Sequence, residues 1–334
     1  MPTSPLPVLL GESEAFLEAV EAASRLAELE RSALVIGERG TGKELFAARI
    51  HYLSPRWDKP FLKLNCAALS EDLLDAELFG HVPGAFTGAQ RARPGRFEAA
   101  DGGSLFLDEL ATMSSRLQEK VLRVIEYGEF EPLGSSETRK ISVRVIGATN
   151  EDLPRAVEQG RFRGDLLDRL SFDVVTLPPL RARRDDILLL AEQFAQHMTS
   201  ELERDVFAGF APGAQAALLD YAWPGNVREL RNVVERSVYR HEAADRPLRH
   251  LIFDPFASPY RPQTQSQTST QTQEAVALPR YPFDLKAFME EQEVDVLKKA
   301  LADHHHHQGQ TAQALGLSYD QLRTLVRKYR LNKS

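Results

Sequence analysis

Apolar residues in the first 180 positions form short runs separated by longer amphipathic segments. The short runs predict strands at 33–36, 61–64, 104–107, 143–148 and 174–177. Each run is apolar through its middle, which is typical of a strand covered on both faces. Because helical segments lie between the strands, residues 1–180 are predicted to form a three-layer α/β domain with a parallel sheet. Ahead of the first strand, segment 13–27 predicts a helix with an apolar face of Phe16, Leu17, Val20, Ala23 and Ala27.

The strand pattern stops after Pro178 and Pro179. Helical periodicity at 185–197, 212–221 and 227–240 replaces it and predicts a helical lid over residues 181–255. Residues 256–281 are rich in Gln, Thr and Ser and show no periodicity. This composition is typical of a flexible linker, and we expect the segment to be disordered.

The last segment, residues 282–334, predicts an all-α domain. It begins with a helix at 284–302 that carries one apolar stripe, followed by a short helix at 310–315 and a turn at Gly316. Ser318 opens the last helix, with Gln321 three residues later as a capping box. This arrangement predicts a helix-turn-helix. Its inward residues are Leu322, Leu325, Val326 and Tyr329, and its predicted DNA-facing residues are Ser318, Tyr319, Asp320, Arg323, Thr324, Arg327 and Lys328.

Composition and charge refine this picture. With 43% hydrophobic and 27% charged residues, the chain has the composition of a soluble globular protein. It has no apolar run of about 20 residues and no signal peptide pattern, so we expect a cytoplasmic protein that does not insert into a membrane. The single cysteine, Cys66, excludes an internal disulfide, and we expect it to be a small core residue.

A net charge of −7 argues against a surface that binds nucleic acid all over. The C-terminal residues 308–334 differ, because basic residues outnumber Asp320 there five to one. A local DNA-binding surface therefore remains compatible with an acidic chain.

A glycine-rich segment lies between the first predicted strand and the helix that follows it. It consists of Gly37, Glu38, Arg39, Gly40, Thr41, Gly42, Lys43 and Glu44. In this context backbone N–H groups and the helix N-terminus bind phosphate, and Lys43 reaches the β- and γ-phosphates of ATP. The alternative is a glycine turn without a ligand. Glu44 stands where a Ser or Thr usually supplies a hydroxyl to Mg²⁺, so this position leaves the metal coordination open.

Two adjacent carboxylates, Asp108 and Glu109, follow the third predicted strand. Asp108 is predicted to hold Mg²⁺ through water, and Glu109 is predicted to polarise the water that attacks ATP. A strand that runs into a helix N-cap is the simpler alternative, and the nearby glycine-rich segment counts against it.

A second short motif has no structural explanation at its position. It consists of Gly84, Ala85, Phe86, Thr87, Gly88 and Ala89. This loop is apolar, flanked by glycines and without charge, so we predict that it is exposed and contacts a partner.

Together these motifs resemble those of the AAA+ ATPases that activate sigma-54 RNA polymerase, the bacterial enhancer-binding proteins. The resemblance covers nearly the whole chain and includes Leu10-Gly11-Glu12-Ser13. It implies an AAA+ domain with a helical lid and a Fis-type helix-turn-helix domain. It further implies a homo-hexamer that hydrolyses ATP with Mg²⁺, contacts the sigma-54 RNA polymerase holoenzyme through the GAFTGA loop and binds upstream enhancer DNA. The family shares the GKE form, which accounts for Glu44.

The resemblance also implies roles for polar residues outside these motifs. Asn65 would restrain Glu109, and Thr149 and Asn150 match the sensor I place that detects the γ-phosphate. Arg228, in the segment 223–230, matches sensor II.

Two arginines, Arg163 and Arg169, resemble the fingers that AAA+ subunits donate to a neighbour's nucleotide. Guanidinium groups suit this role because they stay charged and offer several donors to phosphoryl oxygens. The alternative for each arginine is a surface salt bridge to Asp165 or Asp168.

We expect no receiver or ligand-sensing domain ahead of the predicted ATPase domain, as in the phage shock branch of this family. That likeness implies an inhibitor of the phage shock protein A type, a peripheral membrane protein. We predict that Trp57 binds it, because segment 52–60 has the prolines and charges of a surface loop. The alternative is that Trp57 folds back onto the preceding helix.

Two other functions compete with this interpretation. Another AAA+ remodelling protein, such as a helicase loader, would not explain the GAFTGA loop or the tethered helix-turn-helix. A passive DNA-binding repressor would not explain intact Lys43, Asp108 and Glu109.

Overall fold

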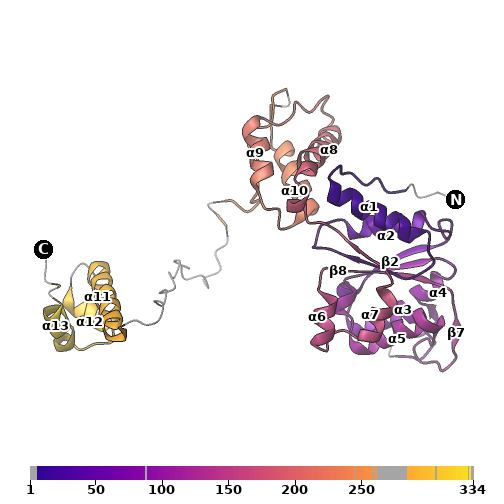
Figure 1. Ribbon diagram of the computed structural model, residues 1–334, viewed down its shortest axis with the longest axis horizontal. Coiled ribbons are helices and arrows are strands. Elements are labelled where there is room, and N and C mark those ends of the chain that lie inside the picture. Colours follow the sequence, from indigo (N-terminus) through magenta and orange to yellow (C-terminus); the bar gives the residue numbers. More distant parts are fainter. Residues whose placement is uncertain are drawn as a thin grey trace. The chain divides into compact units, whose positions relative to one another are not determined.

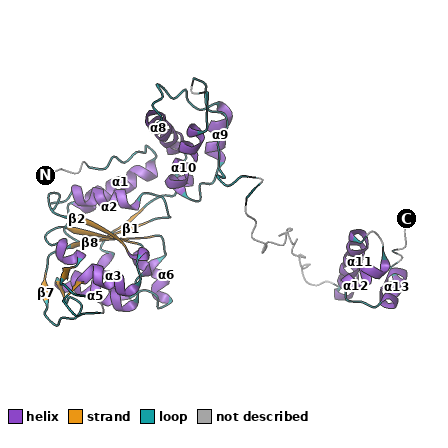
Figure 2. Ribbon diagram, turned by 180° about the vertical axis from the view of Figure 1, so that it is seen from behind, coloured by secondary structure: helices purple, strands orange, loops and turns teal. Residues whose placement is uncertain are grey.

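The computed structural model describes residues 6–86, 89–243, 245–258, 260–261, 284–304, 307–329 and 331. The chain forms two compact units, Met1–Ala257 and Ser258–Ser334, and each is described by itself. Figures 1 and 2 show the first unit as a layered α/β domain joined to a cluster of helices. No helix of the described residues is long and apolar enough to cross a membrane.

A parallel sheet forms the centre of the first unit, with strand order β2-β5-β8-β1-β9. Its strands are β1 (Ala33–Ile36), β2 (Phe61–Asn65), β5 (Ser104–Asp108), β8 (Arg144–Thr149) and β9 (Val174–Thr176). All five predicted strands are therefore confirmed, with ends that shift by at most one residue. Because the strands are parallel, their carboxyl ends meet at one edge, where Ile36 pairs with Thr149 and Asn65 with Asp108.

Helices cover both faces of this sheet, as the apolar runs predict (Figure 1). On one face α1 (Glu14–Ala27) and α2 (Lys43–Tyr52) pack against alternate strand residues such as Val35 and Ile146. On the other face α3 (Glu71–Phe79), α5 (Ser115–Tyr127), α6 (Leu153–Glu158) and α7 (Gly164–Leu170) pack against residues such as Leu105 and Val145. The sheet is thus the middle layer of three.

The apolar face of α1 differs slightly from the prediction. Phe16, Ala23 and Ala27 are buried, whereas Leu17 is half exposed. Ala19 and Leu26 are buried instead, so the helix is turned towards the sheet by a fraction of a turn from the face we expected.

Two small hairpins lie beside the GAFTGA loop. One pairs β3 (Gly80–His81) with β4 (Arg93–Pro94), just before α4 (Arg96–Ala99), and the other pairs β6 (Glu129–Phe130) with β7 (Arg139–Lys140). Leu133 joins them, since its carbonyl accepts from Val82 N and its N–H donates to Gly80 O. A side chain at Gly134 would place its Cβ 2.8 Å from that of Ala85. The turn of the second hairpin therefore contacts the GAFTGA loop at Ala85.

The lid consists of α8 (Asp185–Glu201), α9 (Pro212–Asp220) and α10 (Asn226–Tyr239), close to the predicted helices. Its core surrounds Trp223, which is fully buried and donates from Nε1 to the Leu218 carbonyl at 2.8 Å. A buried indole with its N–H satisfied is a strong anchor for a small helical cluster.

A buried carboxylate, Asp186, ties the lid to the start of α1. It accepts hydrogen bonds from the backbone N–H groups of Glu12 (2.6 Å) and Ser13 (2.9 Å) and from the Ser13 hydroxyl (2.7 Å). Arg183, also buried, donates to it at 2.8 Å and lies over the ring of Phe16. Burial raises the pKa of Asp186, but these hydrogen bonds and the Arg183 charge outweigh it, so that the pKa lies below its usual value.

The second unit contains α11 (Leu285–Asp303), α12 (Gln308–Ala314) and α13 (Tyr319–Lys328). The predicted capping box is present, since Ser318 and Gln321 exchange hydrogen bonds. The stripe on α11 is only partly covered: Leu297 and Leu301 are buried, whereas the earlier apolar residues Leu285, Met289 and Val296 are exposed. Within the described residues, α12 and α13 are too short to cover a 19-residue helix along its whole length. Most of the predicted linker, 262–281, lies outside the described residues.

Candidate active site

The predicted phosphate-binding segment, residues 37–44, connects the end of β1 to the start of α2 and is called the P-loop below. Gly40 and Gly42 have φ values of +81° and +102°, which favour glycine. Gly42 is the N-cap of α2, so the helix N-terminus opens directly onto the loop. This is the geometry in which backbone N–H groups and the helix dipole bind an anionic group.

Lys43 is buried at the first position of α2, and its Nζ donates to the carbonyls of Gly37 (2.9 Å) and Glu38 (3.4 Å). Burial lowers its pKa, while the charges of Glu109 and Asp108 oppose that shift. The lysine thus lies close enough to both carboxylates to feel their charges, as the predicted site requires.

Asp108 ends β5 and accepts a hydrogen bond from the N–H of Glu109 at 3.0 Å. Glu109 has a left-handed backbone, with φ of +51°, which is uncommon for a residue other than glycine. The conformation ends the extended backbone of β5 at Asp108 and begins the 3-10 turn that follows. A left-handed backbone at a residue other than glycine is common at functional sites, which agrees with the predicted role of Glu109 in hydrolysis.

The residue predicted to restrain Glu109 has a different partner here. The Asn65 side chain accepts from Ala67 N at 2.9 Å and so caps the turn after β2. Glu109 instead forms an ion pair with Arg39 of the P-loop, with 3.7 Å between Nε and Oε1. Arg39 is therefore the ion-pair partner of Glu109 in this structure, and the role of Asn65 stays a prediction.

The sequence did not predict how firmly the P-loop is fastened to the lid. Asn226, fully buried at the start of α10, donates to Glu38 Oε2 (3.1 Å) and to the Arg39 carbonyl (3.0 Å), and accepts from Leu180 N (2.8 Å). Arg181 pairs with the same Glu38 carboxylate through two hydrogen bonds. Hydrogen bonds from Arg181 and Asn226 hold the pKa of Glu38 at about 2, so it is ionised at neutral pH. Motif matching missed this contact because its partners lie 143 and 188 residues apart.

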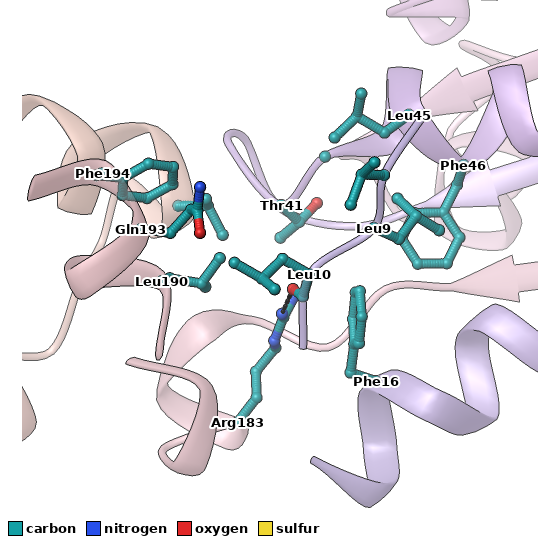
Figure 3. A pocket seen from close by; sticks show the side chains of 13 residues that line it. Leu9, Leu10, Phe16, Thr41, Leu45, Phe46, Arg183, Leu190, Gln193 and Phe194 are labelled. Carbon is teal, nitrogen blue, oxygen red and sulfur yellow. Dashed lines mark hydrogen bonds between the residues drawn. The ribbon is translucent and has the colours of Figure 1, made fainter. Parts of the chain in front are cut away.

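An apolar cavity of about 340 Å³ lies beside the P-loop (Figure 3). Thr41, Leu45 and Phe46 line one side, Leu9, Leu10 and Phe16 another, and Arg183, Leu190, Gln193, Phe194 and Val227 of the lid segment close it. A largely apolar lining with a few polar groups suits a flat aromatic base. The sequence motifs did not predict this cavity, because its lining comes from several separate segments of the chain.

The predicted sensors lie on either side of the P-loop. Thr149 is buried at the end of β8, and its carbonyl accepts from Gly37 N at 3.2 Å, while Asn150 is exposed. Arg228 on α10 is exposed and lies against Gly40, and its charge contributes to lowering the pKa of Lys43. Glu44 forms an ion pair with Lys63 at 2.7 Å and is exposed.

The two predicted fingers lie around α7. Arg163 pairs with Asp165 (2.7 Å) and Glu119 (3.4 Å), and Arg169 pairs with Glu126 (2.5 Å) and not with Asp168. Among the described residues, no hydrogen bond or ion pair connects either arginine to the P-loop of the same chain. The arrangement is compatible with fingers that act on another subunit.

Of the GAFTGA loop, Gly84, Ala85, Phe86 and Ala89 are described, while Thr87 and Gly88 lie outside the described residues. Gly84 N donates to Ala89 O at 2.8 Å, which closes the base of the loop. Phe86 is 45% exposed and touches His81 edge-on, with 4.9 Å between ring centroids. The prediction of an exposed apolar loop holds for Phe86, whereas Ala89 is buried.

Cys66 lies next to this site but has no part in its chemistry. It is buried, and burial, aided by the charges of Asp108 and Glu109, raises its pKa to about 12. The thiol stays protonated at neutral pH, in keeping with the predicted core role.

A P-loop, two strand-end carboxylates and a helical lid that closes a base-sized cavity define an AAA+ ATPase, here carrying a helix-turn-helix. Comparison with known families agrees. Residues 9–176 match the sigma-54 interaction domain, 181–275 the AAA+ ATPase lid domain, and 288–329 the bacterial regulatory proteins of the Fis family. The chain belongs to the sigma-54-dependent transcriptional activators, and its activation domain is an ATPase.

Individual relatives support the same assignment. The chain is 55% identical over 323 residues to the Psp operon transcriptional activator of Escherichia coli K12, covering 97% of this chain and 98% of that protein. It is 49% identical over 230 residues to the regulatory protein AtoC of the same organism, which is 69% of this chain and 50% of AtoC. The structure of NtrX from Brucella abortus in complex with ATP is similar, with a TM-score of 0.68 and 31% identity, over 96% of this chain and 69% of that one.

Proposed function

We propose that this ATPase assembles as a homo-hexamer and uses ATP hydrolysis to drive the GAFTGA loop against the sigma-54 RNA polymerase holoenzyme, which remodels the closed promoter complex. The observation that carries the proposal is the exposed Phe86 on a loop whose base is closed by hydrogen bonds. An exposed aromatic on a fastened base suits a contact that transmits force, because the tip meets the partner while the base moves with the domain.

For the nucleotide we propose that the P-loop backbone and Lys43 bind the phosphates of ATP, and that Thr149, Asn150 and Arg228 sense them. Asp108 would hold Mg²⁺ through water, since carboxylate oxygens suit this ion and Glu44 is paired with Lys63. Bound Mg²⁺ neutralises phosphate charge. Glu109 would orient the attacking water once Arg39 releases it, and Arg163 and Arg169 would complete the neighbouring subunit's site.

For DNA we propose that the helix-turn-helix binds upstream enhancer sites through α13. Ser318, Tyr319, Asp320, Arg323, Thr324, Arg327 and Lys328 are all exposed. The basic members of this set provide the phosphate contacts that make such binding sensitive to salt.

Single-round transcription from a sigma-54 promoter tests the proposal, on templates with and without upstream DNA. We expect open complexes with ATP and none with a non-hydrolysable analogue, and a lower protein requirement when the upstream DNA is present. Phe86→Ala and Thr87→Ala are expected to keep ATPase activity within about twofold of the parent while losing promoter opening, because the loop lies outside the nucleotide site. Phe256→Ala, at another exposed phenylalanine, is the matched control. Activation without hydrolysis, or loss of hydrolysis in an intact Phe86→Ala hexamer, would overturn the proposal.

We further propose that an inhibitor of the phage shock protein A type binds at Trp57. The indole is 56% exposed, which is the opposite of a ring folded back onto the preceding helix. Its neighbour Arg56 donates to the carbonyls of Gly103 (3.1 Å) and Ser142 (2.8 Å), which fixes the loop to the sheet. A rigidly held, exposed tryptophan is a frequent binding anchor.

Replacement of Trp57 tests this docking site. Trp57→Ala is expected to preserve basal ATPase activity and to weaken inhibition by at least about 2 kcal/mol, or about 30-fold, in a titration with the purified inhibitor. Tyr239→Ala, which removes an exposed aromatic from the lid, is the control. Equal inhibition of the Trp57 variant and the parent would exclude the site.

A further inference from the structure

One fully buried side chain, Gln118 of α5, connects the turn that follows Glu109 with the segment that leads to Arg163. Its amide nitrogen donates to the carbonyls of Met113 (2.8 Å) and Arg161 (3.1 Å). Its amide oxygen accepts from the N–H of Arg163 at 2.8 Å. Three of the four hydrogen bonds that a glutamine side chain can make are therefore used on backbone groups.

The first of these connections leads to the strand-end carboxylates. Glu109 begins a short 3-10 turn, in which Thr112 donates from both N–H and hydroxyl to the Glu109 carbonyl. Met113 closes this turn through a hydrogen bond to the Leu110 carbonyl, and its side chain is buried. Gln118 therefore holds the far end of the turn on which Glu109 sits.

The second connection leads to Arg163, which is the N-cap residue of α7. The preceding residue, Phe162, is buried in the core, so the backbone is fixed up to the point where the arginine side chain leaves it. Beyond that point the guanidinium lies at the surface, paired with Asp165 and Glu119. Surface ion pairs of this kind are weak and can be exchanged for a stronger anion.

From this geometry we infer that Gln118 is a positioning residue for the Arg163 finger, which it fixes to the carboxylate turn of its own subunit. The inference rests on the proposed trans role of Arg163. Gln118 is bonded both to the turn that carries Glu109 and to the backbone of Arg163. The turn therefore determines the position from which the Arg163 side chain reaches a neighbouring nucleotide. Loss of the amide would leave the buried Met113 carbonyl, the Arg161 carbonyl and the Arg163 N–H without this partner, and segment 161–163, which is only partly buried, is the one that can move towards solvent.

Mixed rings separate this role from general support of the core. Lys43→Ala chains, which cannot use their own site, serve as finger donors to Arg163→Ala chains, whose own site is intact. We expect Lys43→Ala donors to restore ATPase activity, and Lys43→Ala/Gln118→Leu donors to restore at most about a tenth as much. With the Lys43→Ala donor, Arg163→Ala/Gln118→Leu acceptors should regain ATPase activity to within about twofold of that of Arg163→Ala acceptors. The reason is that Gln118 is needed in the chain that supplies the finger and not in the chain that receives it. Lys43→Ala/Arg123→Ala, changed at an exposed position of the same helix, is the control donor.

Each outcome of this experiment is decisive. Failure of the simple Lys43→Ala donor, in rings shown to be mixed by co-purification of differently tagged chains, contradicts the finger proposal itself. If the Lys43→Ala/Gln118→Leu donor restores as much activity as the Lys43→Ala/Arg123→Ala control donor, Gln118 does not position the finger. The same conclusion follows if Gln118→Leu reduces the restored activity equally in the donor and in the acceptor chain. Gln118→Glu keeps the acceptor for Arg163 and much of the volume, and is expected to give intermediate rescue. If Gln118→Leu does not assemble, the same comparisons are made with Gln118→Glu.

Discussion

Lys43→Ala is expected to eliminate ATP binding, whereas Glu109→Ala is expected to bind ATP normally and to lose at least about 100-fold in turnover. Lys43 is buried at the N-terminus of α2 with its ammonium directed at the P-loop carbonyls, where a phosphate would replace those contacts. Its loss removes a charge-assisted contact to the phosphates from the centre of the P-loop. Glu109 lies one residue beyond the sheet and is predicted to touch only the attacking water, so binding does not depend on it.

Titration with a fluorescent ATP analogue and a phosphate-release assay measure the two effects separately. The matched control is Glu21→Ala, at an exposed carboxylate of α1 that pairs with Arg25, and it should change neither quantity by more than about twofold. Parental hydrolysis by Glu109→Ala would show that the assignment of the strand-end carboxylates is wrong.

Asp186→Ala is expected to destabilise the first unit by about 3–5 kcal/mol, because it leaves the Arg183 guanidinium buried without its charge partner. The N–H groups of Glu12 and Ser13 lose their acceptor in the same step. Since the pKa of Asp186 in the folded protein is below its usual value, the contribution is fully present above about pH 4 and is lost as the pH falls further.

Urea unfolding of the ATPase domain at neutral pH measures this loss. The paired replacement Arg183→Leu/Asp186→Leu removes both charges and should be less destabilising than Asp186→Ala alone. Asp185→Ala, at the preceding residue on the exposed side of α8, is the control. A loss below about 1 kcal/mol for Asp186→Ala would mean that this buried pair does not hold the lid to α1.

The sequence was sufficient for the strands and the phosphate-binding loop because both depend on neighbouring residues. An apolar run such as 104–107 and a glycine such as Gly42 express their structural role locally. The contacts of Asn226, Asp186 and Gln118 could not be predicted in this way. Each side chain bonds backbone or side-chain groups in a distant segment, so its partners are set by how the layers stack and not by any local pattern.

Three differences from the sequence predictions have a similar origin. Asn65 satisfies a backbone N–H two residues away, a local hydrogen bond that competes with any longer reach to Glu109. The stripe on α11 has the right spacing, but periodicity does not state how much neighbouring surface is available to cover it. Arg39 was assigned to the P-loop from its position, yet nothing in the motif indicated that it would pair with the carboxylate predicted to orient water.

The hydrogen bond from Gly84 to Ala89 has a mechanical consequence. It joins the two ends of the GAFTGA hexapeptide, and Leu133 holds the segment just before the hexapeptide through hydrogen bonds with Gly80 and Val82. Because Leu133 holds Gly80 and Val82 and Ala89 holds Gly84, a displacement of β3 carries the backbone up to Phe86 with it. Insertions between Gly84 and Phe86 would lengthen the unanchored stretch ahead of Phe86 and weaken this coupling, whereas the pairing of β3 with β4 would be left unchanged.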